Sequence, residues 1–312
     1  MVMVNILTFF FRASERIMYK KIAVVAACLA IGMLSAQSTK LKFAAGFVGG
    51  TYYKIGKSLS KLSKTKVTTL ETKGSQENIK LVAEGKADLG LVQLDILNNS
   101  VKVGDELRSK LKVILPIYRE EVHILSHKKY TSYKQLKGKT ISVGSSFSGT
   151  SESANIILIA MKLKGRVKID RSETGLALKR LKRKEIDAVF IVAGAPIDLL
   201  ARDRFKYNLI PFKGTALAML TGPYFPYKKS TVKRKQYKWL KKNIQTISVA
   251  SVLIVNSSMS DAQVSSLVKK IIKGKKKLAR SHRKWNELNV KYARKFLKAL
   301  GKGAHPAALT AL

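Results

Sequence analysis

The feature of this sequence that most limits its possible folds is a short apolar run that opens into a glycine turn and then into a helix. The run ends at Gly46, the turn is Gly49-Gly50-Thr51, and apolar side chains follow it at helical spacing. We expect a helix from Thr51, with the Thr51 hydroxyl as its cap. Backbone N–H groups and the positive end of a helix dipole meet at such a turn, so it suits an anion or a carboxylate. An ordinary strand-to-helix turn without a ligand is the alternative interpretation.

A second turn of the same kind follows. The alternating, β-branched run Val67–Thr72 predicts a strand that ends at Gly74-Ser75. A helix over 76–84 is predicted after it, with Ser75 as its N-cap. Residues 87–93 then predict a short buried strand, which ends in Gln93.

The third turn begins a second series of elements. A strand is predicted over Thr140–Val143, then a polar turn over 144–150 and a helix over 151–163. The hydroxyls and glycines of this turn suit a carboxylate, phosphate or sulfonate, and a serine-rich capped turn is the alternative. A buried strand over 186–192 ends this series. Alternation of this kind predicts parallel sheets with right-handed crossovers, which bind ligands outside the carboxyl ends of the strands.

The remaining pattern divides the chain into two domains. The second domain is predicted over 123–246 and the first, discontinuous one over 41–122 plus 247–312. We expect the two domains to close on a ligand. The other predicted elements are separate strands over 113–117 and 122–126, loop-rich residues 197–246, a strand over 246–255, a helix from Asp261 capped by Ser260 or Asp261, and a last helix over 285–300.

The amino-terminal residues read as an export signal. From Met18 a short basic region precedes an apolar run of 13 residues, too short for a spanning helix, and small residues end it. We therefore assign 1–36 as a signal segment, with the true start at Met18 and cleavage after Ala36. A lipoprotein box with a lipidated Cys28 is the alternative. Either form places the body of the protein in the periplasm.

The charge of the chain is strongly one-sided. Its 312 residues contain 60 Lys and Arg against 19 Asp and Glu, a net charge of +41. Such an excess favours nucleic acid, anionic lipid or acidic partners, but the lysines are scattered and no nucleic-acid motif accompanies them. The one cysteine and the four histidines form no metal-ligand spacing, and no hydrolase, P-loop or dinucleotide motif is present. We expect no metal, no cofactor and no enzymatic activity.

Six motifs stand in one order between about residue 41 and about residue 310. They are Gly49-Gly50-Thr51-Tyr52-Tyr53, Gly74-Ser75-Gln76-Glu77-Asn78, residues 87–95, Ser148-Gly149-Thr150, residues 186–190 with Gly194-Ala195-Pro196, and His305-Pro306-Ala307-Ala308. In content and order they resemble the TAXI family, the solute-receptor subunits of a class of TRAP transporters.

The resemblance implies a two-domain α/β protein of the type II periplasmic-binding-protein fold, with a ligand cleft between the domains. It also implies an extracytoplasmic receptor that delivers a small organic acid or amino acid, glutamate-like or a dicarboxylate, to TRAP permease subunits. We expect a small anionic or zwitterionic solute as the ligand, no specific nucleic acid, and a monomer.

The candidate ligand-binding residues lie at the turns and strand ends. One departure from the family is Ser151, where many members have arginine, so no single fixed cation is expected to bind a carboxylate here. We expect Gln93 and Asp95 to meet a polar or ammonium group of the ligand, and Tyr52 to line the cleft. Asp95 as a helix cap and Tyr52 as a core aromatic residue are the alternatives at those positions. The candidates are Gly49, Gly50, Thr51, Tyr52, Gly74, Ser75, Gln93, Asp95, Ser146, Ser148, Gly149, Thr150, Ala193, Gly194 and Pro196.

Two other functions stay open. A basic extracytoplasmic adhesion or nucleic-acid-binding protein would use the +41 surface, and its affinity for DNA or anionic lipid would fall steeply with salt. A receptor of an ABC importer would have the same fold. Neighbouring genes for a TRAP permease or for an ATPase pair would distinguish the two transporters.

Overall fold

The computed structural model describes residues 39–62, 65–99 and 105–312, and residues 40–312 form one compact unit. The predicted signal segment, its start at Met18, its cleavage after Ala36 and the alternative lipidation of Cys28 lie outside the described residues.

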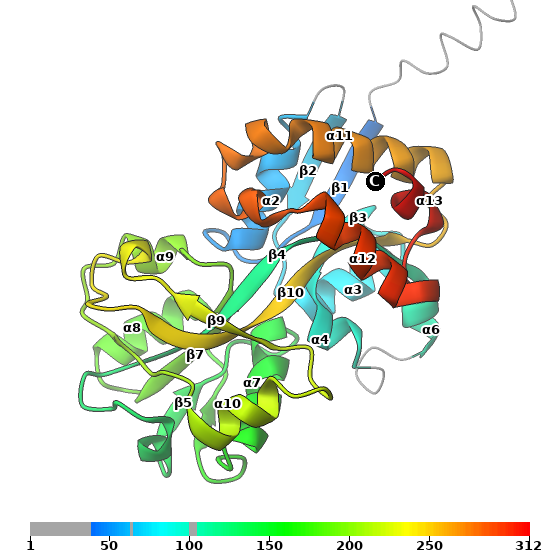
Figure 1. The fold of residues 1–312 in the computed structure, drawn as a ribbon. Coiled ribbons are helices and arrows are strands. Elements are labelled where there is room, and N and C mark those ends of the chain that lie inside the picture. The colour runs from blue at the N-terminus through cyan, green and yellow to red at the C-terminus, as the bar shows by residue number, and fades with distance from the viewer. Residues whose placement is uncertain (1–38, 63–64, 100–104) are drawn as a thin grey trace, which may run out of the picture. The chain divides into compact units, whose positions relative to one another are not determined.

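Within the described residues, ten strands form one sheet (Figure 1). They are β1 (Thr39–Ala44), β2 (Thr65–Leu70), β3 (Leu89–Gln93), β4 (Leu111–Ser126), β5 (Thr140–Ser142), β6 (Lys168–Asp170), β7 (Ala188–Ala193), β8 (Asn208–Leu209), β9 (Lys228–Val232) and β10 (Ile244–Asn256). The order of neighbours is β2-β1-β3-β10-β4-β7-β5-β6, with β8 beside β4 and β9 beside β10.

Helices pack beside both ends of this sheet (Figure 1). The α-helices are α2 (Thr51–Leu59), α3 (Ser75–Ala83), α4 (Leu94–Leu97), α6 (Asp105–Ser109), α7 (Gly149–Ala160), α8 (Thr174–Lys182), α9 (Asp198–Ala201), α10 (Gly214–Leu220), α11 (Asp261–Ala279), α12 (Val290–Leu300) and α13 (Pro306–Thr310). The 3-10 helices are η1 (Tyr133–Leu136), η2 (Arg234–Gln236), η3 (Arg283–Glu287) and η4 (Gly301–Gly303). None of the helices in residues 39–62, 65–99 and 105–312 has the length and apolar character needed to span a bilayer.

The sheet is mixed, so the predicted parallel pairing is present in only part of it. β1 and β3 pair in parallel, as do β5 with β6 and β5 with β7. β10 is antiparallel to β3, and β4 is antiparallel to β7. The parallel pairs are those joined by strand–helix–strand connections, where parallel pairing was expected. The two long strands are antiparallel to each other, so β10 runs against β1 and β3, and β4 runs against β5 and β7.

The strand β4 is continuous, which corrects the prediction of separate strands over 113–117 and 122–126. The acidic pair Glu120-Glu121 interrupts the apolar pattern but not the backbone pairing, because β10 pairs with β4 from Leu111 to Glu121. The register shifts between Ser251 and Val252, where Val252 pairs with Pro116. A proline lacks the N–H that a ladder needs, so a β-bulge at this point accommodates it.

The buried apolar side chains define two lobes. One cluster is drawn from residues 41–118 and 250–308, and two further clusters are drawn from residues 122–249. We call residues 40–118 with 250–312 the first lobe and residues 119–249 the second lobe. Among the described strands, β4 and β10 alone run through both lobes (Figure 1), and we call their paired segment the hinge. The predicted boundaries of two separate domains stay a prediction, because the lobes share one sheet.

The predicted helix caps had mixed outcomes. Ser260 caps α11 in a capping box with Gln263, as predicted. Thr51 and Ser75 do not cap their helices, and Gly50 and Gly74 stand at the N-cap positions. The hydroxyls of Thr51 and Ser75 bond instead to groups far away in the sequence. These two caps were therefore wrong.

The packing of α2 against the sheet predicts the effect of a substitution at Gly56. A Cβ atom there would lie 2.6 Å from Cδ1 of Phe43 and 2.8 Å from Cγ2 of Thr69. We expect Gly56→Ala to lower the free energy of unfolding by about 1–3 kcal/mol through overpacking. Gly175→Ala in α8 is the matched control, since nothing lies within 4 Å of its Cβ position. Its stability should stay equal or rise by up to about 1 kcal/mol in chemical denaturation. Equal losses in the two variants would contradict the close approach at Gly56.

Candidate functional site

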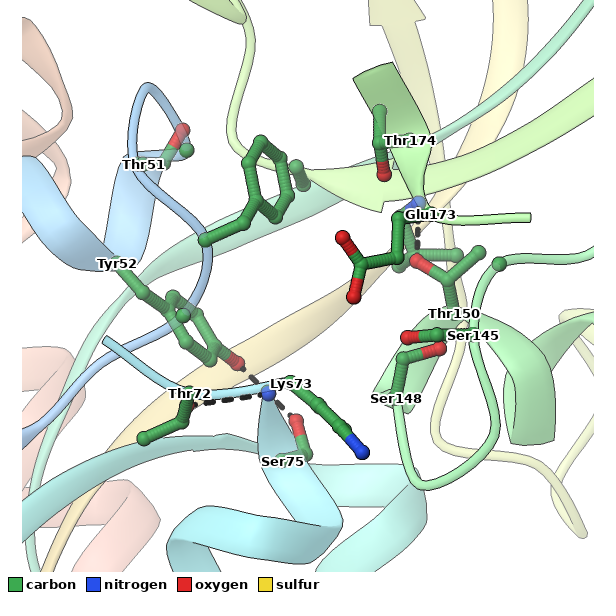
Figure 2. A pocket seen from close by; sticks show the side chains of 18 of the residues that line it. Thr51, Tyr52, Thr72, Lys73, Ser75, Ser145, Ser148, Thr150, Glu173 and Thr174 are labelled. Carbon is green, nitrogen blue, oxygen red and sulfur yellow. Dashed lines mark hydrogen bonds between the residues drawn. The ribbon is translucent and has the colours of Figure 1, made fainter. Parts of the chain in front are cut away.

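A cavity of about 590 Å³ lies between the two lobes. Figure 2 shows Thr51, Tyr52, Thr72, Lys73 and Ser75 of the first lobe facing Ser145, Ser148, Thr150, Glu173 and Thr174 of the second. The structure brings ten of the candidate residues to its wall: Gly50, Thr51, Tyr52, Gly74, Ser75, Gln93, Ser148, Gly149, Thr150 and Ala193.

Five of the candidates do not line the cavity. Gly49 has a positive φ of 88° in the turn before α2, and Ser146 is exposed in the turn before α7. The carbonyl of Gly194 accepts the hydroxyl of Thr51 at 2.7 Å. Pro196 follows a cis peptide bond, and the carboxylate of Asp95 is buried behind the cavity wall. Of these five, Gly194 and Asp95 make hydrogen bonds between the lobes.

The starts of three helices meet at the cavity. Gly50, Gly74 and Ser148 are the N-cap residues of α2, α3 and α7, and all three line the cavity. The Ser148 hydroxyl accepts the backbone N–H of Ser151 at 3.1 Å, as a helix cap does. Free N–H groups in the first turns and the three helix dipoles give this wall a partial positive charge. The arrangement can hold a carboxylate.

Glycine at position 149 permits the close approach of the lobes. A Cβ atom on Gly149 would lie 1.6 Å from Oε1 of Gln93 and 2.7 Å from Oγ of Ser75. A Cβ atom on Gly74 would lie 3.6 Å from the backbone nitrogen of Gly149. The turns 74–75 and 148–150 are therefore in contact across the cleft.

Buried hydrogen bonds join the lobes around Asp95. Its carboxylate accepts the hydroxyls of Ser153 at 2.6 Å and Tyr227 at 2.7 Å, both from the second lobe. Gln93 Nε2 donates to Ser153 Oγ at 3.1 Å. Burial raises the pKa of Asp95, and the two hydroxyl donors oppose that rise. Asp95 and Ser153 are thus the centre of a buried link between the lobes.

The charged side chains of the cavity wall are mostly acidic. Among the described lining residues they are Glu71, Lys73, Glu77, Glu120 and Glu173. Glu71 accepts the backbone N–H of Val48 at 3.0 Å, and Glu77 accepts that of Lys73 at 2.7 Å. The sign of this charge is opposite to that of the chain as a whole, which carries +41. Sequence reasoning named none of these five residues as site residues.

Glu120 is the most perturbed of these groups. It exposes only 2% of its surface, and burial raises the pKa of its carboxyl to about 8. Burial and the neighbouring Glu120 carboxyl also raise the pKa of Tyr52 well above its ordinary value. The signal in the sequence was the pair Glu120-Glu121, two acids inside an otherwise apolar strand. Perturbed acids at a cavity wall mark functional sites more often than structural ones.

On the other side of β4, Glu121 is fully paired. Lys284 Nζ donates to Glu121 Oε1 at 2.7 Å, to Glu287 Oε1 at 2.7 Å and to the carbonyl of Arg119 at 2.8 Å. The backbone N–H of Ala195 donates to Glu121 Oε2 at 2.8 Å. This buried ion pair fixes η3 and the turn after β7 against the hinge.

His305 lies away from the cavity, at the N-cap of α13.

The described residues contain no cluster of His, Cys, Asp and Glu with the arrangement of a metal site. The cavity wall offers a ligand backbone N–H groups, hydroxyls and carboxylates.

Comparison with known proteins agrees with this architecture. The chain has the two-domain α/β fold of the type II periplasmic solute-binding proteins. A structure from Listeria monocytogenes described as that of an L-cystine ABC transporter has a TM-score of 0.51 at 13% identity, covering 80% of this chain and 98% of its own. The structure of Tv2483 bound to L-arginine has a TM-score of 0.52 at 12% identity, covering 83% and 94%. The NMT1-like family model matches residues 43–310, and the chain belongs to that family. The predicted fold class is confirmed.

The raised pKa of Glu120 makes stability depend on pH. The folded carboxyl, with a pKa of about 8, holds its proton more tightly than the unfolded one near 4.5, so the free energy of unfolding falls as pH rises between these values. We expect Glu120→Gln to remove this loss, which amounts to at most about 1.4 kcal/mol per pH unit. Urea unfolding of both proteins from pH 5 to pH 8 measures the difference. Parallel curves for the two proteins would contradict the assignment.

Proposed function

We propose that this protein is an extracytoplasmic solute receptor that binds an amino acid or a small organic acid in the cavity between its lobes. The observation that carries the proposal is the meeting of three helix starts, from α2, α3 and α7, at one cavity between the lobes. Membership of the NMT1-like family and the solute-binding-protein fold support it. The cavity volume of about 590 Å³ suits a metabolite of this size.

In this proposal the ligand carboxylate binds at the first turns of α3 and α7, where Ser75, Ser148 and Thr150 line the cavity. Ligand binding favours the state in which the lobes touch, and the joined surface of the lobes is what a membrane permease recognises. The two structural relatives named above are described with L-cystine and L-arginine, which supports an amino acid as the ligand.

The motif resemblance supports a TRAP permease as the partner, a periplasmic location after removal of 1–36, a monomer and no enzymatic activity. An ABC importer is the alternative partner, since the structural relatives include an ABC transporter protein.

The net charge of +41 favours a second candidate function, which is binding to DNA or anionic lipid. That binding would weaken steeply with salt, whereas solute binding in the cavity would not.

The ligand class is tested by isothermal titration of the mature chain with L-glutamate, L-glutamine, L-arginine, glutarate and succinate. We expect at least one of these compounds to bind with one site per chain, and to raise the thermal unfolding midpoint because it binds only the folded state. Folded protein that binds none of them would remove this ligand class.

The contact at Gly149 connects closure to binding. We expect Gly149→Ala to keep each lobe folded but to hold the turns 74–75 and 148–150 apart, because its Cβ would overlap Gln93. The affinity for the bound compound should fall by at least about tenfold, which corresponds to about 1.4 kcal/mol of closure energy. Small-angle scattering with saturating ligand should show a larger radius of gyration than in the wild-type protein. Unchanged affinity would show that closure does not depend on this contact.

A further inference from the structure

Three buried oxygen atoms beside the cavity have no hydrogen-bond partner within the part of the chain that the structure describes. They are Tyr118 Oη, Glu120 Oε1 and Ser251 Oγ. Their residues expose 3%, 2% and 0% of their surface. Buried polar atoms are nearly always paired in proteins, so three unpaired ones in neighbouring residues call for a group that pairs with them.

These atoms belong to one place on the hinge. Ser251 is the cross-strand partner of Tyr118, and Glu120 follows Tyr118 by two positions, which puts both side chains on one face of β4. The register shift after Ser251 is the β-bulge described above, and bulges often redirect side chains next to binding sites. Tyr118, Glu120 and Ser251 therefore form a single polar cluster, which we call the hinge cluster.

The hinge cluster opens to the cavity through Glu120. Glu120 and Tyr52 both line the cavity, and the Tyr52 hydroxyl lies 3.5 Å from Ser75 Oγ at the start of α3 (Figure 2). The side chain of Tyr52 therefore lies between the hinge cluster and the start of α3, where the ligand carboxylate is proposed to bind. Of the three cluster residues, Glu120 is the one that lines the cavity, so a small ligand meets the cluster at the Glu120 carboxyl.

The hinge cluster is rich in hydrogen-bond acceptors, and Lys284 faces it with its Nζ 5.6 Å from the centroid of the Tyr118 ring. The carboxyl of Asp95 disfavours ionisation of Glu120, and the hydroxyls of Tyr52 and Ser251 favour it. Lys284 acts on Glu120 only weakly, since its Nζ is already bonded to Glu121, Glu287 and the Arg119 carbonyl. A ligand carboxylate at this point would keep Glu120 protonated, whereas a ligand cation would favour its ionised form.

We propose that the hinge cluster is the subsite for an ammonium group of the ligand, with Glu120 as its anionic partner. An ammonium group has three N–H donors and no acceptor, which matches three unpaired oxygen atoms, of which one is a carboxylate oxygen. The inference rests on the proposed function and narrows its ligand class. The receptor binds amino acids and discriminates against dicarboxylates that lack an amine.

The test compares amino acids with the same compounds lacking the α-amine. The pairs are L-glutamate with glutarate, L-glutamine with glutaramate, and L-arginine with 5-guanidinopentanoate, each titrated into the mature chain. The amino acid that binds should bind about 10- to 100-fold more tightly than its amine-free partner, as expected for hydrogen bonds to a charged group. Equal affinity within the pair, or binding of dicarboxylates alone, would overturn the inference and leave the proposed function intact. If no compound binds, the proposed function fails and the inference fails with it.

Glu120→Gln is the decisive variant. It should remove the preference for the amine, whereas Glu106→Gln, an exposed glutamate of α6 away from the cavity, should keep it.

Because the Glu120 carboxyl with its pKa of about 8 is protonated in the free protein at pH 7, binding of an ammonium should release close to one proton. Titration in phosphate and in Tris buffers counts that proton, and Glu120→Gln should release none. A preserved preference or unchanged proton release in folded Glu120→Gln would contradict the subsite.

Two milder variants test the same subsite if Glu120→Gln does not fold. Tyr118→Phe and Ser251→Ala each remove one hydroxyl at nearly constant volume, and circular dichroism checks their fold. Each should weaken binding of the amino acid by about 3- to 10-fold and leave its amine-free partner unaffected. Equal weakening of both compounds would show a structural role for the hydroxyls and would overturn the proposal.

Discussion

The pairing of β4 with β10 is the constraint on which the rest of the structure depends. From Leu111 to Glu121 the two strands are hydrogen-bonded side by side, and each continues into both lobes. Two paired strands keep the lobes joined while they rotate, and register shifts after Ser251 and after Leu253 interrupt the ladder between them. The elements around the cavity can therefore separate and meet again in the same arrangement. That property is what a receptor needs if it binds and releases a solute at one site.

The contacts across the cavity explain why the arrangement of glycines and hydroxyls matters more than the shape of the cavity alone. The Gly149 backbone lies where any side chain would collide with Gln93, and Ser153 lies between Asp95 and Gln93. These bonds are buried and are made between lobes, so their strength is gained only when the lobes meet. Opening exposes their polar groups to water, which replaces the lost bonds at small net cost. The balance between open and joined lobes is therefore small enough for a ligand to shift.

The sequence predicted the local structure better than the contacts between distant segments. The turns before α2, α3 and α7 were found because glycine and small polar residues between apolar runs have a local cause. Thr51 and Ser75 were assigned to caps by the same local reasoning. In the folded chain they bond to Gly194 and Gln93, which are distant in sequence. No local pattern contains that information.

The same limit explains what was missed at the site. Glu120 and Glu121 fell between the two strands predicted over 113–117 and 122–126, and charged residues seldom lie within a buried strand. Their burial depends on Lys284, Tyr52 and Ser251, which the fold brings to β4 from three other segments. Tyr227, which donates to Asp95, came from a stretch that was assigned only to loops. The fold class was accessible from repeated turns, whereas the buried polar groups were accessible only from the assembled sheet.

The large surface charge and the acidic cavity act over different distances, and this difference decides what each can select. Exposed lysines are screened by salt within about 8–10 Å, so the +41 charge attracts anions in general without distinguishing between them. Glu120 is buried, where screening is weak and an unpaired charge is costly. A dicarboxylate gains from the surface field but has no cation for Glu120. A zwitterionic amino acid gains little from the field, yet its two ends match the helix starts and the carboxyl of Glu120. Local pairing in the buried site is therefore expected to outweigh the long-range attraction in choosing the ligand.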